Sequence, residues 1–283
     1  MNPKRTMSRI GVGAFALAMA VAAHAQSAAD QESAKEQPAA KNGSSKSMTV
    51  AAQAETAAAP AKENAEKKPE PAAKNSNSKS GSLDQVLHSM DENAAKFRSA
   101  QADFVWTPYN SVINDTEPPD RGKIYFRKVG SEIQMGATIQ PPDDRQIVFA
   151  AGKVEVYQPK TKVLDVYDTS AHKAEVESFL VLGFGSSGQD LRKSFEVKYL
   201  GEQKIGSVAT GHLQLTPLSD KVKTNFPRID LWINPQGLSL RQQLFQTGGD
   251  YRLADYSNVR LNEKVPESAF KIKSPGGTRT VTH

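Results

Sequence analysis

The sequence predicts a mainly β fold with some α-helix, in which antiparallel strands form one curled sheet. Between residues 101 and 260, apolar and polar side chains alternate in short runs, which is the period of β-strands. Short gaps containing turn-forming residues separate many of these runs, which favours hairpins over parallel strands with crossover helices. The runs also have one apolar face each, so the sheet is expected to curl around an apolar interior.

The first 25 residues have the features of a secretory signal peptide. Basic residues at positions 4, 5 and 9 precede an apolar stretch from 10 to 23, and the Ala-His-Ala sequence at 23–25 fits a cleavage site. The apolar stretch is short for a transmembrane helix. We therefore expect residues 1–25 to be a cleaved signal and the mature chain to be secreted and soluble.

Residues 26–81 consist mostly of Ala, Lys, Glu, Ser, Asn and Pro and have almost no large apolar side chains. Such a segment buries too little surface to offset the entropy lost on ordering. The composition predicts a disordered, solvated tether, with a plain spacer favoured over a segment that reaches across the periplasm or contacts the cell wall.

The folded domain is expected from residue 82 to 283 and to begin with an amphipathic helix. The sequence Ser-Leu-Asp-Gln at 82–85 matches a capping box, which marks a helix start. One apolar stripe follows at helical spacing. It consists of Leu83, Val86, Leu87, Met90, Ala94 and Phe97.

Eleven strands are expected after this helix, in an antiparallel meander. Their ranges are 101–109, 122–128, 132–138, 145–150, 153–158, 163–168, 195–202, 208–217, 228–234, 238–246 and 250–260. The segment 170–195 interrupts them, and its pattern predicts a helix, a glycine-rich turn and a short second helix. The sequence leaves three candidates for what fills the interior of the curl: the sheet's own side chains, the helices or a ligand.

Composition and motifs argue against several kinds of function. Part of the formal charge of +5 comes from the three basic residues of the signal, and the remaining basic and acidic residues nearly balance. Nucleic-acid binding, which needs a clustered basic face, is therefore not expected. There is no cysteine, so neither disulfides nor a lipid-modified cysteine can form.

The apparent chemical motifs have simpler explanations. Residues 183–188, Gly-Phe-Gly-Ser-Ser-Gly, match a dinucleotide-binding fingerprint in letters but follow a helix instead of a strand, so we expect a flexible turn and a possible hinge. His88, His172 and His212 lack metal-ligand spacing. Residues 114–122 fit no calcium loop, and no catalytic motif occurs. The sequence thus predicts no metal, no cofactor and no catalytic residue.

Several stretches, in order, resemble LolA-type outer-membrane lipoprotein carriers. In 145–168 an apolar strand, Gly152-Lys153, a strand with Tyr157 and then Pro159 match the family's hairpin, with Ala151 in place of its Asp. The segments 99–106 and 121–135 are similar to early strands of that family. Residues 229–277 are similar to its closing strands and its terminal Phe-x-x-x-Pro, with one residue more between Phe270 and Pro275.

This resemblance, which extends over about 82–277, implies an open half-barrel of about eleven antiparallel strands with helices forming a lid over an apolar cavity. It also implies a monomeric periplasmic chaperone that binds the acyl chains of lipoproteins. In that family the cargo comes from an inner-membrane ABC-type exporter and passes to an outer-membrane acceptor.

The resemblance and the strand alternation together suggest site residues. The expected cavity wall consists of apolar side chains on one face of the strands, namely Phe104, Ile124, Phe126, Ile133, Met135, Leu215, Leu231, Ile233 and Leu244. The expected lid residues are Phe179, Leu182 and Phe184. Arg127 and Lys128 match the family's basic pair, one member of which contacts the lid as a gate; alternation places Lys128 inward, although Val129 replaces the family's proline and leaves the register open.

Three alternatives remain at this point. The chain could carry another lipid, or act as a periplasmic regulator that senses lipoproteins. The least favoured alternative is an enzyme built on the same barrel.

Overall fold

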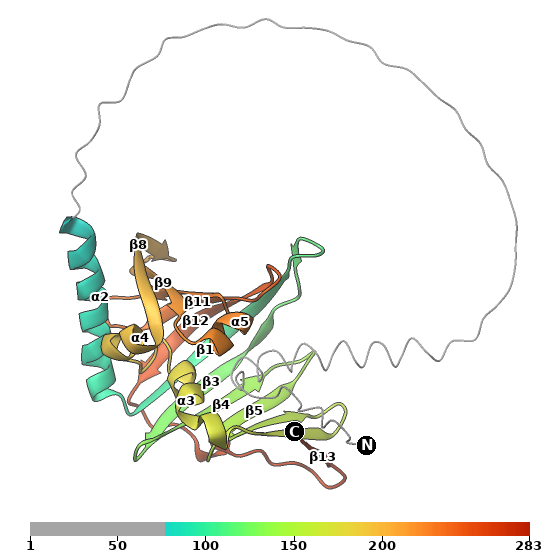
Figure 1. Cartoon of the computed structure of the whole chain (residues 1–283). Coiled ribbons are helices and arrows are strands. Elements are labelled where there is room, and N and C mark those ends of the chain that lie inside the picture. The colour runs from blue at the N-terminus through green and yellow to red at the C-terminus, as the bar shows by residue number, and fades with distance from the viewer. Residues whose placement is uncertain (1–76) are drawn as a thin grey trace, which may run out of the picture.

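The computed structural model describes residues 77–283, which form one open, curled sheet with helices packed on its concave side (Figure 1). This confirms the predicted fold class. The expectations for the signal at 1–25 and for the tether up to residue 76 lie outside the described residues.

Thirteen strands make up the sheet, in the order β13-β7-β6-β5-β4-β3-β1-β12-β11-β10-β9-β8, with β2 paired only to β1. All neighbouring strands are antiparallel except β13, which pairs with β7 in parallel. The strands are β1 (Ser99–Asn110), β2 (Asp115–Thr116), β3 (Asp120–Val129), β4 (Glu132–Ile139), β5 (Arg145–Ala150), β6 (Lys153–Gln158), β7 (Val163–Asp168), β8 (Phe195–Ile205), β9 (Val208–Pro217), β10 (Arg228–Ile233), β11 (Ser239–Phe245), β12 (Tyr251–Leu261) and β13 (Arg279–Thr282).

All eleven predicted strands are present, but β2 and β13 were not predicted. β2 has only two residues, and β13 is a short polar segment that becomes a strand by pairing with β7. Neither carries enough apolar alternation to be seen in sequence.

The helices are α2 (Asn77–Lys96), η1 (Ser170–His172), α3 (Lys173–Leu180), α4 (Gly188–Ser194), α5 (Asp220–Asn225) and η2 (Glu267–Phe270). The predicted start of the first helix at Ser82 is wrong, because α2 begins at Asn77. The capping-box pattern marks one possible start, but no proline in 77–81 prevents an earlier one. The short helices α5 and η2 were missed.

Strand alternation produces two apolar clusters on the concave side. The β3–β6 cluster combines inward side chains of β1, β3, β4, β5 and β6 with residues of α3 and β12. The β8–β11 cluster combines inward side chains of β8 to β11 with residues of α2 and α4. The interior of the curl is therefore filled by the sheet's own side chains together with a few residues of α2, α3, α4 and the segment between α3 and α4.

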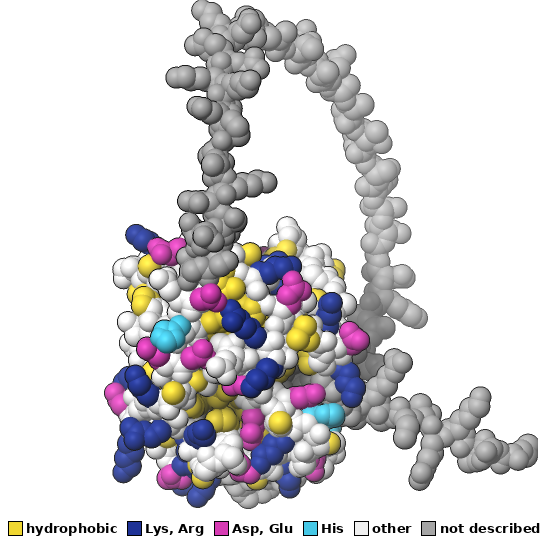
Figure 2. All heavy atoms as spheres, turned by 60° about the vertical axis from the view of Figure 1, so that its left-hand side comes forward, with side chains coloured by type: hydrophobic (Ala, Val, Ile, Leu, Met, Phe, Trp, Pro, Cys, Tyr) yellow, Lys and Arg dark blue, Asp and Glu magenta, His cyan; other side chains and the backbone are white. Residues whose placement is uncertain are grey.

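The outer surface shows no single-sign charge field on the face that carries α2. In Figure 2, Lys and Arg side chains alternate with Asp and Glu side chains across that face. None of the helices within 77–283 is long and apolar enough to cross a membrane.

Candidate functional site

The predicted wall residues all lie on the concave face of the sheet. Phe104, Ile124, Phe126 and Met135 belong to the β3–β6 cluster, and Ile133 packs against it half-buried. Leu215, Leu231, Ile233 and Leu244 belong to the β8–β11 cluster. The structure therefore brings them together as two groups and not as one continuous wall.

The segment between α3 and α4, residues 181–187, is called here the lid connector, and it joins the two clusters. Leu182 is buried in the β8–β11 cluster, whereas Phe184, two residues later, is buried in the β3–β6 cluster. The Phe184 ring lies edge-on to Tyr256, with centroids 4.8 Å apart, and 5.2 Å from the Phe126 ring. The third predicted lid residue, Phe179, is half-buried on α3 and meets the Phe195 ring edge-on at 5.7 Å. The lid connector thus occupies the middle of the concave face.

Three carbonyl groups of the lid connector accept hydrogen bonds from the surrounding frame. Gln242 Nε2 on β11 donates to the Leu182 carbonyl at 2.6 Å, and Asn93 Nδ2 on α2 donates to the Phe184 carbonyl at 2.6 Å. Between them, the backbone N–H of Ser239 donates to the Gly183 carbonyl at 2.7 Å. Because the donors come from two separate elements, α2 and β11, they fix the connector in one position.

Tyr256 orients the Gln242 amide. Its hydroxyl donates to Gln242 Oε1 at 3.2 Å, which leaves the amide nitrogen for the lid connector. Burial raises the pKa of Tyr256, so the phenol keeps its proton and remains a donor. Asn93 and Gln242 are both buried, where an unsatisfied carbonyl is costly.

The predicted basic gate is not in contact with the lid connector in this structure. Arg127 points to the convex face, where it pairs with Glu267 and its guanidinium lies 4.2 Å above the Phe270 ring. Lys128 is exposed, and its side chain makes no hydrogen bond or ion pair with any described residue. Strand alternation explains why Arg127 faces away, and the position of Lys128 near the end of β3 explains its exposure. The expected contacts to lid carbonyls are made by Asn93 and Gln242 instead.

The glycines expected to form a hinge serve close packing. An added Cβ at Gly183, which has φ +77°, would lie 2.5 Å from Ser239 Cβ. A Cβ at Gly185 would lie 2.8 Å from the Phe97 ring, and one at Gly188 would lie 2.7 Å from Leu87 Cβ. These distances are too short for a side chain, so the glycines let the connector and α4 lie against β11 and α2.

The preceding helix, α3, is fastened to the start of β4. Lys173 pairs with Glu132, and Glu177 Oε1 accepts a hydrogen bond from the Ile133 backbone N–H at 3.4 Å. The hydrogen bond and charge of Glu132 raise the pKa of Lys173. These contacts are exposed or half-buried, so they contribute less than the buried amide contacts of the connector.

A charged group bounds the apolar surface where β3 and β5 begin. Asp120 and Arg145 form an ion pair, and they are register partners of the core residues Trp106 and Ile139, which places them on the concave side. Burial lowers the pKa of Arg252 nearby. Because apolar surroundings are unfavourable for charged groups, the apolar surface of the concave face ends at this ion pair.

Sequence reasoning missed Asn93 and Gln242. Both are ordinary polar residues within otherwise regular elements, and each is informative only because its side chain is buried. The one available signal was Gln242 itself, a polar residue at an inward position of its strand. Among the described residues no group of three or more His, Cys, Asp or Glu could hold a metal ion.

The chain resembles known carriers in sequence. The family model "Outer membrane lipoprotein carrier protein LolA" matches residues 95–273. The outer-membrane lipoprotein carrier protein of Bordetella avium (strain 197N) is 27% identical over 187 residues, which cover 66% of this chain and 82% of that protein.

Two solved structures are similar to part of this chain. MucB is 13% identical, with a TM-score of 0.44, over 69% of this chain and 64% of its own. A LolA superfamily protein from Nitrosomonas europaea is 14% identical, with a TM-score of 0.33, over 67% of this chain and 97% of its own.

Proposed function

Because the chain belongs to the LolA family of outer membrane lipoprotein carrier proteins, we propose that it carries the acyl chains of lipoproteins through the periplasm. The cargo would arrive from an ABC-type exporter in the inner membrane and leave to an acceptor at the outer membrane. The family is one of carriers and not of enzymes, and binding acyl chains requires apolar area without catalytic groups.

The observation that carries this proposal is the insertion of the lid connector into both apolar clusters. Leu182 and Phe184 cover concave surface that acyl chains could cover equally well. Cargo would enter when the connector withdraws, and the connector would return when cargo leaves. The lid is thus a competitor of the cargo for one surface.

The energies favour exchange of this kind. Each buried methylene contributes about 0.8 kcal/mol, so a dozen methylenes of cargo contribute roughly 10 kcal/mol. Against this, re-exposing the buried Leu182 and Phe184 side chains costs about 1.5–3 kcal/mol each, and the three hydrogen bonds to the connector contribute about 0.5–1.5 kcal/mol each. The two sides are thus of similar size, so cargo can displace the connector and the returning connector can help to release cargo.

The test uses the mature protein with a fluorophore that emits in apolar surroundings. We expect fluorescence on binding and loss of fluorescence when an acylated lipopeptide is added. The same peptide without acyl chains is the control and is expected to have no effect. Failure of acyl chains to compete, or turnover of an ester substrate, would contradict the carrier proposal.

Native mass spectrometry of protein purified from periplasm identifies the cargo. A co-purifying lipopeptide supports lipoprotein transport, whereas a different lipid indicates the alternative of a carrier for another membrane component. Transfer of loaded lipoprotein to acceptor membranes then separates a carrier from a sensing regulator, which would retain its ligand.

A further inference from the structure

The convex side of the sheet carries a second structural unit, the C-terminal strap, defined here as residues 262–278. It crosses β3, β4 and β5, and its helix η2 lies directly on β4. An added Cβ at Gly136 would lie 1.8 Å from the Ala269 carbonyl oxygen, so only glycine allows this approach. Arg127 fixes the strap by pairing with Glu267 and stacking on Phe270.

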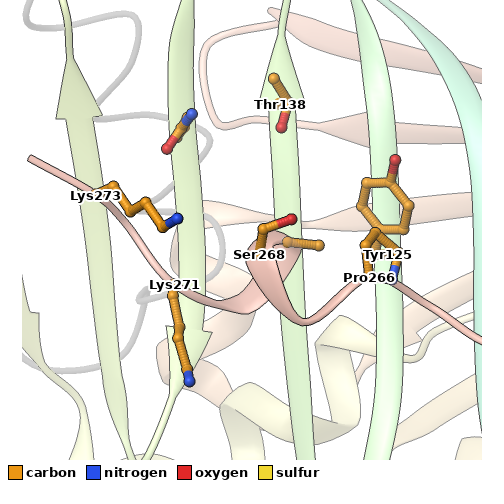
Figure 3. A pocket seen from close by; sticks show the side chains of 8 residues that line it. Tyr125, Thr138, Pro266, Ser268, Lys271 and Lys273 are labelled. Carbon is orange, nitrogen blue, oxygen red and sulfur yellow. The ribbon is translucent and has the colours of Figure 1, made fainter.

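A pocket of about 220 Å³ lies between the strap and the sheet. Its lining comes from both sides, namely Tyr125, Thr138 and Gln146 from the strands and Pro266, Ser268, Ala269, Lys271 and Lys273 from the strap. In Figure 3 the Thr138 and Ser268 side chains face each other, and Lys273 reaches in from one side. Because a water molecule occupies about 30 Å³ in the liquid, the pocket has room for a small polar group.

Most of the lining side chains can donate hydrogen bonds, and none of them is a carboxylate. Six of its eight side chains are hydroxyls, an amide or ammonium groups, and no Asp or Glu is among them. Within residues 77–283, none of these six side chains forms a hydrogen bond or ion pair with a neighbouring side chain or backbone group. Glu267, the strap's carboxylate beside the pocket, is held by Arg127, whose hydrogen bond and charge lower the pKa of Glu267; the charge of Lys271 lowers it to a smaller extent.

We propose that this pocket binds an oxyanion of the phosphate type, either free or as part of a lipid head group. Lys273 and Lys271 supply positive charge, and the hydroxyls of Thr138, Ser268 and Tyr125 supply directed donors. The pocket is on the face opposite the apolar clusters, so this site is separate from the proposed acyl site. Both lysines are on the strap, so an anion that also contacts Thr138 would join the strap to the sheet.

The test measures binding of inorganic phosphate by NMR titration of the mature protein. We expect shifts at Thr138, Ser268 and Lys273, and at least a fivefold rise in Kd in the Lys273→Gln, Lys271→Gln double variant. Thr138→Val, which removes a donor and keeps the charge, is expected to weaken binding by a smaller factor. Lys264→Gln is the matched control, because Lys264 is exposed on the same strap and does not line the pocket.

A second arm distinguishes the source of the anion. Vesicles of phosphatidylglycerol are compared with vesicles of phosphatidylcholine in flotation assays, with the double variant beside the wild type. Vesicle binding that depends on both lysines supports a lipid head group, and phosphate binding alone supports a free anion. Equal phosphate affinity in the double variant and Lys264→Gln overturns the proposal. Acyl-probe binding should be the same in all of these variants, so failure here is distinguishable from failure of the proposed carrier function.

Discussion

Replacing Gln242 by Leu tests whether a neutral amide holds the lid connector closed. The substitution removes the donor to the Leu182 carbonyl and the acceptor of the Tyr256 hydroxyl, while keeping similar bulk. A buried carbonyl left without a partner costs about 1–3 kcal/mol. Opening the connector lets water hydrogen-bond to this carbonyl. In the variant, the free energy of the open state relative to the closed state should therefore fall by that amount.

At about 1.4 kcal/mol per factor of ten, this corresponds to a 5- to 150-fold larger opening constant. Hydrogen exchange of the amides of Phe184, Gly185 and Ser186 reports it directly, because all three donate to the Val181 carbonyl in the closed connector. Exchange at these amides should accelerate by that factor, while amides of the central strands change less.

Gln243→Leu is the matched control. Gln243 is the next residue on β11, its partner in β10 is Asp230 on the convex face, and it does not contact the connector. It should leave exchange at 184–186 unchanged. If the amides of residues 184–186 exchange at the same rate in both variants, the Gln242 amide does not hold the connector closed.

Three further predictions concern packing and charge. Phe184→Ala should destabilise the fold by about 3–5 kcal/mol, as for other large core aromatics, and should increase binding of the apolar probe, which thermal melts and titration would show. Gly188→Ala should lower the melting temperature through about 1–3 kcal/mol of overpacking against α2; an unchanged melting temperature would favour a hinge instead. Because Arg127 lowers the pKa of Glu267 below 4.5, that pair contributes stability above this pH, and the contribution disappears as the pH falls through the lowered value. The gap in melting temperature between wild type and Glu267→Gln should therefore be present at pH 7 and shrink as the pH falls below 4.5 and through the lowered pKa; a gap independent of pH would contradict it.

The sequence predicts the strands well because alternation is a local property. The bounds of β5, β6, β7 and β9 agree with the predicted ranges, and all nine wall residues are on the concave face. In each case a period of two and one apolar face determine the outcome without knowledge of distant residues.

What could not be predicted depends on contacts between distant residues. Asn93 and Phe184 are 91 positions apart, and Gln242 and Leu182 are 60 apart. Nothing local distinguishes these amides from others in the chain. The role of Gly185 likewise depends on Phe97 approaching it, and the same letters fit a hinge equally well.

The division of the concave face into two clusters affects how a carrier can release its cargo. If one compact lid covered one cavity, cargo would compete with a single apolar plug. Here Leu182 and Phe184 enter different clusters, and the carbonyls of 182–184 are held between α2 and β11. Withdrawal of the connector would therefore uncover part of both clusters together, and in the proposed function acyl chains lying in either cluster would oppose its return. Cargo with more than one chain would hold the connector out in two places, so removing one chain would let the connector start to close while the other chain is still bound.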